Sequence, residues 1–182
     1  MLTLVLLSGG LDSVALVSFY RASGRDMLAL YVDYGQLAAR YERRAAVNVA
    51  SHYGIDLIEI TYTGVKKFSN GYIPGRNALL LSVALTEFPE SSGVVSIGIH
   101  SGTDYVDSWG SFIEKMQDVY DVYADGRIQV DAPFLEWNKG QVYSLCINNR
   151  VPVELTYSCE VGTSPPCGQC LSCRDRIFLN AY

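Results

Sequence analysis

The sequence predicts a single α/β domain with a doubly wound, mainly parallel sheet. Short apolar runs alternate with segments of helical periodicity, and a glycine-rich turn separates the first apolar run from the first helical segment. Strands that alternate with helices form parallel sheets through right-handed crossovers, and such sheets bind ligands at the carboxyl ends of their strands. A chain of 182 residues fits one domain whose core needs no disulfide support.

The predicted strands are apolar runs that end at turn residues. Leu2–Leu7 ends at Ser8-Gly9-Gly10, a pattern typical of a strand buried on both faces. The other predicted strands are Met27–Tyr34, Asp56–Ile60, Gly93–Ile99 and Ile128–Ala132.

A helix is predicted after each strand. Gly54 is expected to end the second helix, and Thr163–Pro166 indicates an irregular tail, so the fifth helix is expected to be the last regular one. The predicted helices are Leu11–Ala22, Leu37–Tyr53, Arg76–Phe88, Ser111–Tyr123 and Asn138–Asn149.

Composition and charge narrow the function classes. The chain is 49% hydrophobic and 18% charged, which is typical of a fully folded globular protein. A net charge of -5 argues against broad, sequence-independent binding to nucleic acid. The apolar stretch Met1–Leu7 is too short for a signal peptide or a membrane span, so we expect a cytoplasmic protein with no membrane partner.

The turn after the first strand predicts a phosphate-binding loop, Ser8-Gly9-Gly10-Leu11-Asp12-Ser13. Backbone N–H groups converge where a glycine turn meets a helix N-terminus, and the helix dipole favours an anion there. The Ser8 and Ser13 hydroxyls can donate to phosphate oxygens, and Asp12 is interpreted as a residue beside magnesium or a helix cap. The alternative is a simple tight turn with a capping side chain.

Four of the five cysteines predict a metal site near the end of the chain: Cys159, Cys167, Cys170 and Cys173. The spacing lets four thiolates reach one tetrahedral ion, which favours a structural zinc site with no open coordination position. An iron–sulfur cluster or a redox pair is the competing interpretation. Cys146 is predicted to be a small core residue.

These motifs, with others in order along the chain, resemble the QueC family, the 7-cyano-7-deazaguanine synthases. That family belongs to the PP-loop ATP pyrophosphatases, of the adenine nucleotide alpha-hydrolase type. The further matching residues are Val32-Asp33-Tyr34-Gly35-Gln36, Ile73-Pro74-Gly75-Arg76-Asn77, Ile97-Gly98, Asp104-Tyr105, Ala132-Pro133, Lys139 and Ser158-Cys159.

The resemblance implies the fold, the reaction and the partners. Residues 1–182 would form one PP-loop domain, with 156–182 as its zinc-binding segment. ATP, with Mg²⁺, would adenylate 7-carboxy-7-deazaguanine, and ammonia would convert the product to the amide and then to the nitrile, with release of AMP and pyrophosphate. The family is commonly a homodimer, which the resemblance implies for this chain as well.

The resemblance also implies which residues act. Lys139, Arg76 and Asp12 would be catalytic, because cations offset the charge that grows at the attacked α-phosphate. ATP would contact the phosphate loop together with Gln36, Arg76, Asn77 and Lys139. The acid would contact Asp104, Tyr105, Asp107 and Trp109.

One segment departs from the family pattern. The family continues after Asp104-Tyr105 with a G-Y-P-D-C-R-like stretch, whereas this chain has Val106–Phe112 with no proline, cysteine or arginine. A second hypothesis is therefore a QueC-like ligase that passes the activated acid to another amine, such as a protein N-terminus, as members found beside antiphage systems do. A third is a non-catalytic nucleotide-binding scaffold, against which the intact loop and Lys139 argue.

Overall fold

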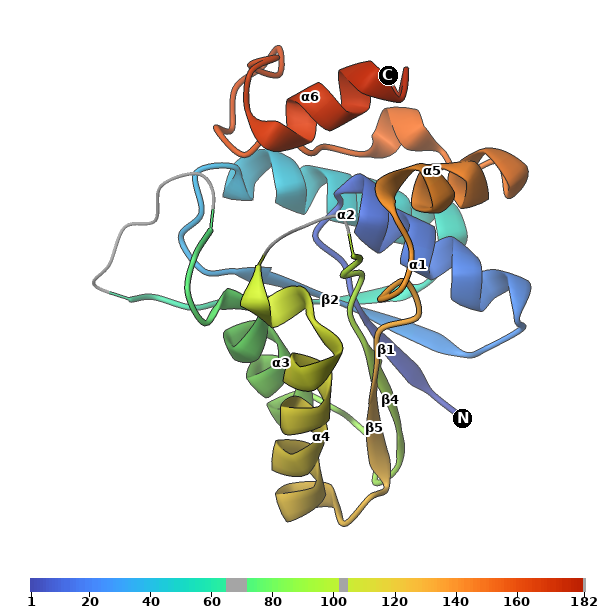
Figure 1. Cartoon of the computed structure of the whole chain (residues 1–182). Helices are drawn as coiled ribbons and strands as arrows, with labels where there is room; N and C mark the ends of the chain where they lie inside the picture. Colours follow the sequence, from blue (N-terminus) through green and yellow to red (C-terminus); the bar gives the residue numbers. More distant parts are fainter. Residues whose placement is uncertain (65–71, 102–104, 182) are drawn as a thin grey trace.

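The computed structural model describes residues 1–64, 72–101 and 105–181, and it contains a five-stranded, all-parallel sheet with the strand order β3-β2-β1-β4-β5 (Figure 1). The strands are β1 (Thr3–Leu6), β2 (Met27–Asp33), β3 (Asp56–Thr61), β4 (Gly93–Ser96) and β5 (Ile128–Asp131). The helices are α1 (Leu11–Ala22), α2 (Ala39–Tyr53), α3 (Arg76–Thr86), α4 (Gly110–Ala124), α5 (Lys139–Asn148) and α6 (Leu171–Phe178), with short 3₁₀ turns η1 (Val106–Ser108) and η2 (Val153–Leu155).

Helices cover both faces of the sheet, and each face has its own apolar core. In β1, Val5 packs into the core formed with α1, α2 and α5, whereas Leu4 and Leu6 pack into the core formed with α3 and α4 (Figure 1). Side chains alternate along a strand, so a strand that is apolar at successive positions is buried on both faces. The doubly wound fold predicted from the sequence is thereby confirmed.

The order in which the chain adds strands to the sheet reverses at β1: β2 and β3 are added on one side of it, and β4 and β5 on the other. The chain leaves β1 toward α1 on one face, and it leaves β4 toward α4 on the opposite face (Figure 1). The two connections diverge and open a crevice at the carboxyl ends of these neighbouring strands, which is the usual ligand position in open parallel sheets.

The strand β4 is shorter than the predicted strand Gly93–Ile99. It ends at Ser96, although the amide of Ile97 still donates to the carbonyl of Asp131 at 3.0 Å. Beyond it the chain turns toward α1, and a Cβ atom at Gly98 would lie only 3.0 Å from the carbonyl oxygen of Asp12. Gly98 therefore permits a close approach of the two connections that frame the crevice.

The expectation that the last regular helix is Asn138–Asn149 was wrong, because α6 follows the cysteine-rich segment. This helix has only eight residues, and two of the metal-site cysteines lie at its start, Cys170 as N-cap and Cys173 in the first turn. The carboxylate of Glu160 accepts hydrogen bonds from the amide and hydroxyl of Ser172, at 3.1 and 2.8 Å. Contacts from outside the helix thus stabilise a segment too short to show a helical pattern.

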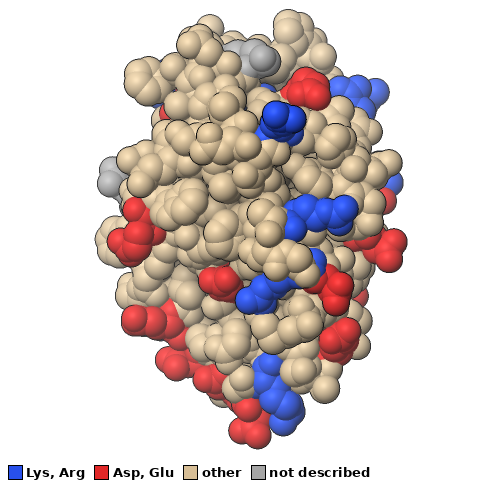
Figure 2. Space-filling view, turned by 90° about the vertical axis from the view of Figure 1, so that its right-hand side faces the viewer, with Lys and Arg blue, Asp and Glu red and all other residues tan. Residues whose placement is uncertain are grey.

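Charged side chains of both signs are mixed on one face of the molecule. On the face shown in Figure 2, Lys and Arg side chains are interspersed with Asp and Glu, and the described residues form no large basic patch there. No helix among residues 1–64, 72–101 and 105–181 combines the length and the apolar character needed to cross a membrane.

A buried hydrogen bond between α3 and α4 yields a test of the packing on one face of the sheet. Tyr120 is fully buried, and its hydroxyl donates to the carbonyl of Leu81 at 2.6 Å. Replacing Tyr120 by Phe should lower the free energy of unfolding by about 1 kcal/mol, because the net worth of one such bond is of that size. Tyr123→Phe, at a position 74% exposed on the same helix, should leave it unchanged. Urea denaturation measures both, and equal stability of the two variants would contradict the prediction.

Candidate active site and metal centre

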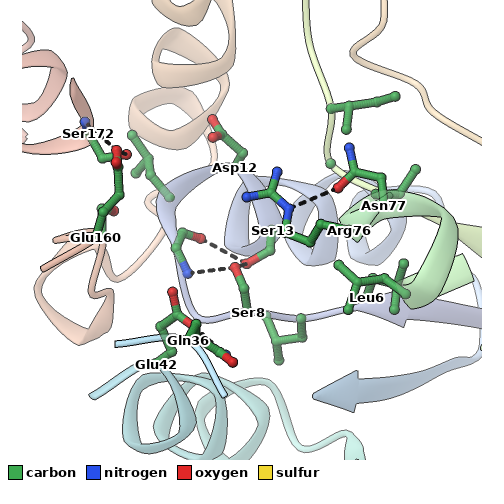
Figure 3. A pocket seen from close by; sticks show the side chains of 18 of the residues that line it. Leu6, Ser8, Asp12, Ser13, Gln36, Glu42, Arg76, Asn77, Glu160 and Ser172 are labelled. Carbon is green, nitrogen blue, oxygen red and sulfur yellow. Dashed lines mark hydrogen bonds between the residues drawn. The ribbon is translucent and has the colours of Figure 1, made fainter. Parts of the chain in front are cut away.

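The predicted phosphate loop lies at the carboxyl end of β1 and leads into α1. Gly10 is the N-cap of α1, and no side chain in the described part of the chain caps this end, so the first amides of the helix face a cavity. The amide of Gly10 donates to the Ser8 hydroxyl at 3.2 Å, and the Ser13 hydroxyl donates to the Gly10 carbonyl at 2.9 Å (Figure 3). This arrangement can receive an anion between backbone amides and two hydroxyls.

The cavity has a volume of about 290 Å³ and opens along the crevice between β1 and β4. Apolar residues such as Leu6, Ile97 and Leu171 line it together with polar and charged ones. It brings together most of the predicted ATP and catalytic residues. Those that line it are Ser8, Gly10, Leu11, Asp12, Ser13, Gln36, Arg76, Asn77 and Lys139.

Lys139 is held directly against the phosphate loop. Its ammonium group donates to both carboxylate oxygens of Asp12, at 2.7 and 2.5 Å. Lys139 is the first residue of α5, whose start is fixed by a capping box: the Asn138 side chain accepts from the Gln141 amide, and the Gln141 side chain accepts from the Asn138 amide. A helix end thus places one cation beside the amides that would bind phosphate.

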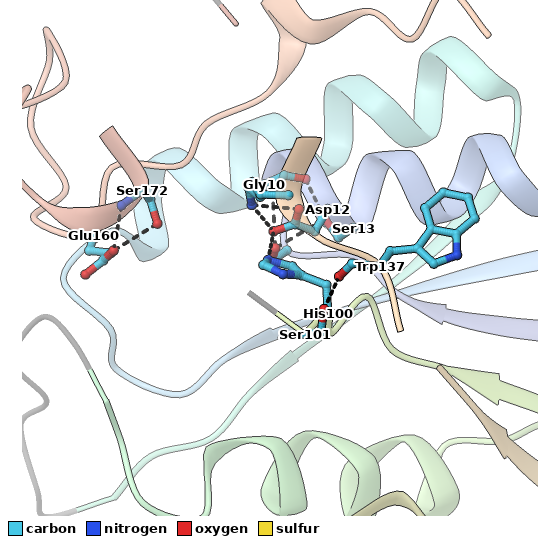
Figure 4. Close-up of polar contacts among 10 residues, drawn as sticks. Gly10, Asp12, Ser13, His100, Ser101, Trp137, Glu160 and Ser172 are labelled. Carbon is cyan, nitrogen blue, oxygen red and sulfur yellow. Dashed lines mark hydrogen bonds and ion pairs between the residues drawn. The ribbon is translucent and has the colours of Figure 1, made fainter. Parts of the chain in front are cut away.

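His100 follows β4 and also approaches Asp12, with its Nε2 atom 3.8 Å from a carboxylate oxygen (Figure 4). Burial lowers the pKa of His100 below its usual value, although Asp12 opposes that shift. The backbone nearby is tied to the segment before α5, because the Ser101 amide and hydroxyl both donate to the Trp137 carbonyl, at 3.0 and 2.7 Å. The connections after β4 and before α5 therefore hold His100 and Lys139 near the same carboxylate of Asp12.

Gln36 lines the cavity next to Glu42, but its amide is engaged inside the protein. Its oxygen accepts from the amide of Tyr34 at 2.9 Å, and its nitrogen donates to Glu42 at 2.8 Å (Figure 3). Burial raises the pKa of the Glu42 carboxyl, while the hydrogen bond from Gln36 and the charge of Arg76 oppose the increase. Glu42 was not among the residues predicted for the site.

Arg76 and Asn77 begin α3 and line the same cavity as the phosphate loop. The Nε of Arg76 donates to the Asn77 side chain at 3.2 Å (Figure 3). The Asn77 amide group donates to the carbonyl of Asp107 at 2.9 Å. Asn77 is only 2% exposed. A link of this kind between α3 and η1 fixes the side of the cavity that the acid was predicted to occupy.

The four residues predicted to contact the acid have different positions. Tyr105 lines the cavity, whereas Trp109 is 52% exposed and is not part of the lining. Asp107 is 5% exposed, and within the described residues neither carboxylate oxygen has a hydrogen-bond partner. Asp104 lies outside the described residues.

The C-terminal segment forms a wall of the cavity that the sequence did not reveal. The amide of Tyr157 donates to the carbonyl of Gly9 at 2.9 Å, and its ring stacks on Tyr41 of α2 with centroids 4.9 Å apart. Arg176 is buried, and its guanidinium donates to the carbonyls of Ala181 and Val153, at 2.7 and 3.2 Å. The additional lining residues from this segment are Tyr157, Ser158, Glu160, Leu171, Ser172, Asp175 and Arg176.

The four predicted cysteine ligands form one cluster directly behind that wall. The sulfur atoms of Cys159, Cys167, Cys170 and Cys173 all lie within 4.8 Å of one another, and those of Cys167 and Cys173 are 3.9 Å apart. Thiolates that share one tetrahedral ion at about 2.3 Å would be about 3.8 Å apart. Burial alone would raise the pKa of Cys159, but hydrogen bonds from the amides of Cys167, Thr163 and Val161 lower it to about 5. The cluster could bind a metal ion.

Comparisons with known proteins agree on the family. A family profile described as "Queuosine biosynthesis protein QueC" matches residues 2–71 and 58–179. A 7-cyano-7-deazaguanine synthase from Prochlorococcus marinus (strain MIT 9312) is 33% identical over 205 residues, covering 94% of this chain and 90% of the relative. The synthase of Methanospirillum hungatei is 32% identical over 201 residues, which cover 94% of this chain and 91% of that relative.

Solved structures support the fold alone. The U34-tRNA thiolase NcsA from Methanococcus maripaludis, solved with its 4Fe-4S cluster, has a TM-score of 0.62 at 16% identity, over 97% of this chain and 64% of its own. A structure described as a predicted subunit of tRNA methyltransferase from Methanocaldococcus jannaschii has a TM-score of 0.58 at 16% identity. The match covers 81% of this chain and 74% of that chain.

The cysteine cluster yields a prediction on metal content and stability. Replacing Cys173 by Ser should abolish metal binding and lower the melting temperature by about 10 °C, because thiolate-bound metal contributes several kcal/mol and each is worth about 2–4 °C in a chain of this size. Cys146→Ala, in the core away from the cluster, should keep the metal. Elemental analysis and calorimetry measure the two effects, and full metal content in the Cys173→Ser protein would refute the site.

Proposed function

This chain belongs to the QueC family of queuosine biosynthesis proteins, and from that premise we propose that it uses ATP to adenylate 7-carboxy-7-deazaguanine and to convert it with ammonia to 7-cyano-7-deazaguanine. The observation that carries the proposal is the cavity at the end of β1. It combines a phosphate loop with uncapped helix amides, the Lys139 ammonium and Arg76 in one open cavity.

The proposed reaction needs both activation and nucleophilic attack. A carboxylate oxygen of the acid attacks the α-phosphate of ATP, which forms the acyl adenylate and releases pyrophosphate. Ammonia then attacks the acyl carbon; the C–O bond to AMP breaks, and the amide forms with loss of a proton. The amide oxygen then attacks the α-phosphate of a second ATP, which releases a second pyrophosphate. The nitrogen loses its two protons as the C–O bond to AMP breaks, and the nitrile forms.

The residues of the cavity suit the first of these steps. The amides of Leu11 to Ser13 would hold the departing pyrophosphate at the positive end of α1. Lys139 and Arg76 would balance the charge that develops at the α-phosphate, and one such group is typically worth about 3 kcal/mol in the transition state. Gln36, whose amide is engaged by Tyr34 and Glu42, would shape the nucleotide pocket rather than bind the nucleotide.

Two metals enter the proposal in different roles. Magnesium would accompany ATP and neutralise phosphate charge, and Asp12 is the loop carboxylate that could contact it after releasing Lys139. The cysteine cluster would hold zinc, because its sulfur separations fit a single tetrahedral ion and four thiolates leave no open position. The role of such zinc is to hold the C-terminal wall in place.

A second candidate is transfer of the activated acid to a larger amine. The segment Val106–Phe112, which departs from the family pattern, places the exposed Trp109 outside the cavity. The same adenylation would then produce an amide conjugate in place of the nitrile. Mass spectrometry of the product distinguishes the two functions.

Lys139 supplies the test of the adenylation step. Purified protein should form AMP and pyrophosphate from ATP only when 7-carboxy-7-deazaguanine is present. Lys139→Gln should lower kcat by about 10²–10³-fold, because it removes a cation from the reacting phosphate. Lys115→Gln, on the far helix α4, should retain full activity. Absence of AMP with any carboxylated deazapurine would refute the proposed function and favour a non-catalytic nucleotide-binding module.

A further inference from the structure

Two tyrosines from separate connections stack on each other at the edge of the cavity. Tyr72 precedes α3 and Tyr105 precedes η1, yet their ring centroids are 5.0 Å apart with an interplanar angle of 27°. Tyr105 lines the cavity, whereas Tyr72 is 42% exposed and does not. Tyr72 therefore covers one face of the ring, so Tyr105 meets the cavity with its other face or its edge.

The contact between α3 and η1 also holds Tyr105 in position, in addition to the stacking on Tyr72. The buried side chain of Asn77 donates to the carbonyl of Asp107 at 2.9 Å, and the amide of Ser108 donates to the Tyr105 carbonyl at 2.9 Å. The turn that carries Tyr105 is thus anchored at its backbone by Asn77 and at its ring by Tyr72. Such a preorganised aromatic side chain suits a flat ligand, because stacking then requires little reordering.

The charge of Asp107, on the same turn, indicates which flat ligand this part of the cavity would bind. Asp107 is buried, and within residues 1–64, 72–101 and 105–181 its carboxylate oxygens accept no hydrogen bond. A negative charge beside the cavity favours, through its electrostatic field, a ring edge whose N–H groups point toward it. A 2-amino-4-oxopyrimidine edge presents an N–H beside an amino group, whereas the edge of adenine pairs its amino group with an acceptor nitrogen that the carboxylate would repel.

We propose that Tyr72 is a positioning residue for the acid: it holds Tyr105 as the stacking surface for the deazaguanine ring, while the charge of Asp107 disfavours adenine at that place. This rests on the proposed function. The Tyr105 ring makes the contact with the base, since the ring and not the Asp107 side chain lines the cavity. The adenine of ATP then occupies the other end of the cavity, near Val32 and Gln36.

Steady-state kinetics with separate titration of the two substrates tests the role of Tyr72. Tyr72→Leu should raise KM for 7-carboxy-7-deazaguanine by about two- to tenfold, the range expected for loss of one aromatic pair. KM for ATP, kcat and the melting temperature should change little, and Tyr72→Phe should behave as the wild type. Tyr123→Leu, an exposed tyrosine on α4, is the matched control. Equal increases in both KM values, or no increase in either, would overturn the proposal.

Binding measurements separate this proposal from the proposed function. Calorimetric titration of the full chain with 7-carboxy-7-deazaguanine requires no turnover. Weaker binding by Tyr72→Leu than by wild type supports the proposal even if no AMP forms, whereas equal binding by the two overturns it while leaving AMP formation intact. A wild-type protein that binds none of the acid would overturn both.

A variant of Asp107 gives a second test, in which ligand preference and melting temperature are measured together. Asp107→Asn should reduce the preference for the acid over its analogue without the 2-amino group, yet it should maintain or raise the melting temperature, because it removes an unpaired buried charge. A carboxylate with only a structural role would show the reverse: a lower melting temperature with an unchanged preference.

Discussion

The close contact between Gly9 and helix α2 sets the position of the phosphate loop, and the rest of the site is built around it. Gly9 has a φ of +79°, and a Cβ atom at this residue would lie 2.7 Å from both the Ala45 side chain and the Ala46 backbone. The loop is therefore pressed against α2 on one side, while its carbonyl receives the amide of Tyr157 from the C-terminal segment. A loop held from two directions keeps its amides aimed at one point, which is what binding of a phosphate chain requires.

The charged groups of the cavity depend on this placement. Asp12 pairs with Lys139 across 127 residues of sequence, and His100 approaches the same carboxylate from the end of β4. Asp12 and Lys139 lie in the first turns of helices, and His100 lies in the connection that follows β4, so the sheet and its helices set their positions. The loop carboxylate and its cation together keep the local charge nearly balanced, and an arriving triphosphate would compete with the carboxylate for the ammonium group.

Local patterns were sufficient to predict the elements that form the site, but not the walls that enclose it. The strand before Ser8, the glycine turn and the cysteine spacing each lie within a few residues, so sequence alone indicated the phosphate loop and the metal cluster. The C-terminal wall depends on contacts such as Gly162 against the backbone of Leu37, which no local pattern encodes. The same holds for the stacking of Tyr72 on Tyr105, whose two segments show no periodicity, and for α6, which has only eight residues and lies among cysteines and prolines.

The cavity is lined by residues from position 6 to position 176, so segments far apart in the sequence must come together before it is complete. Residues from Tyr157 to Arg176 form one of its walls, and the amide of Tyr157 donates to the carbonyl of Gly9 in the phosphate loop. A proteolytic cut just before Tyr157 would therefore open the cavity and remove one of the two supports of that loop.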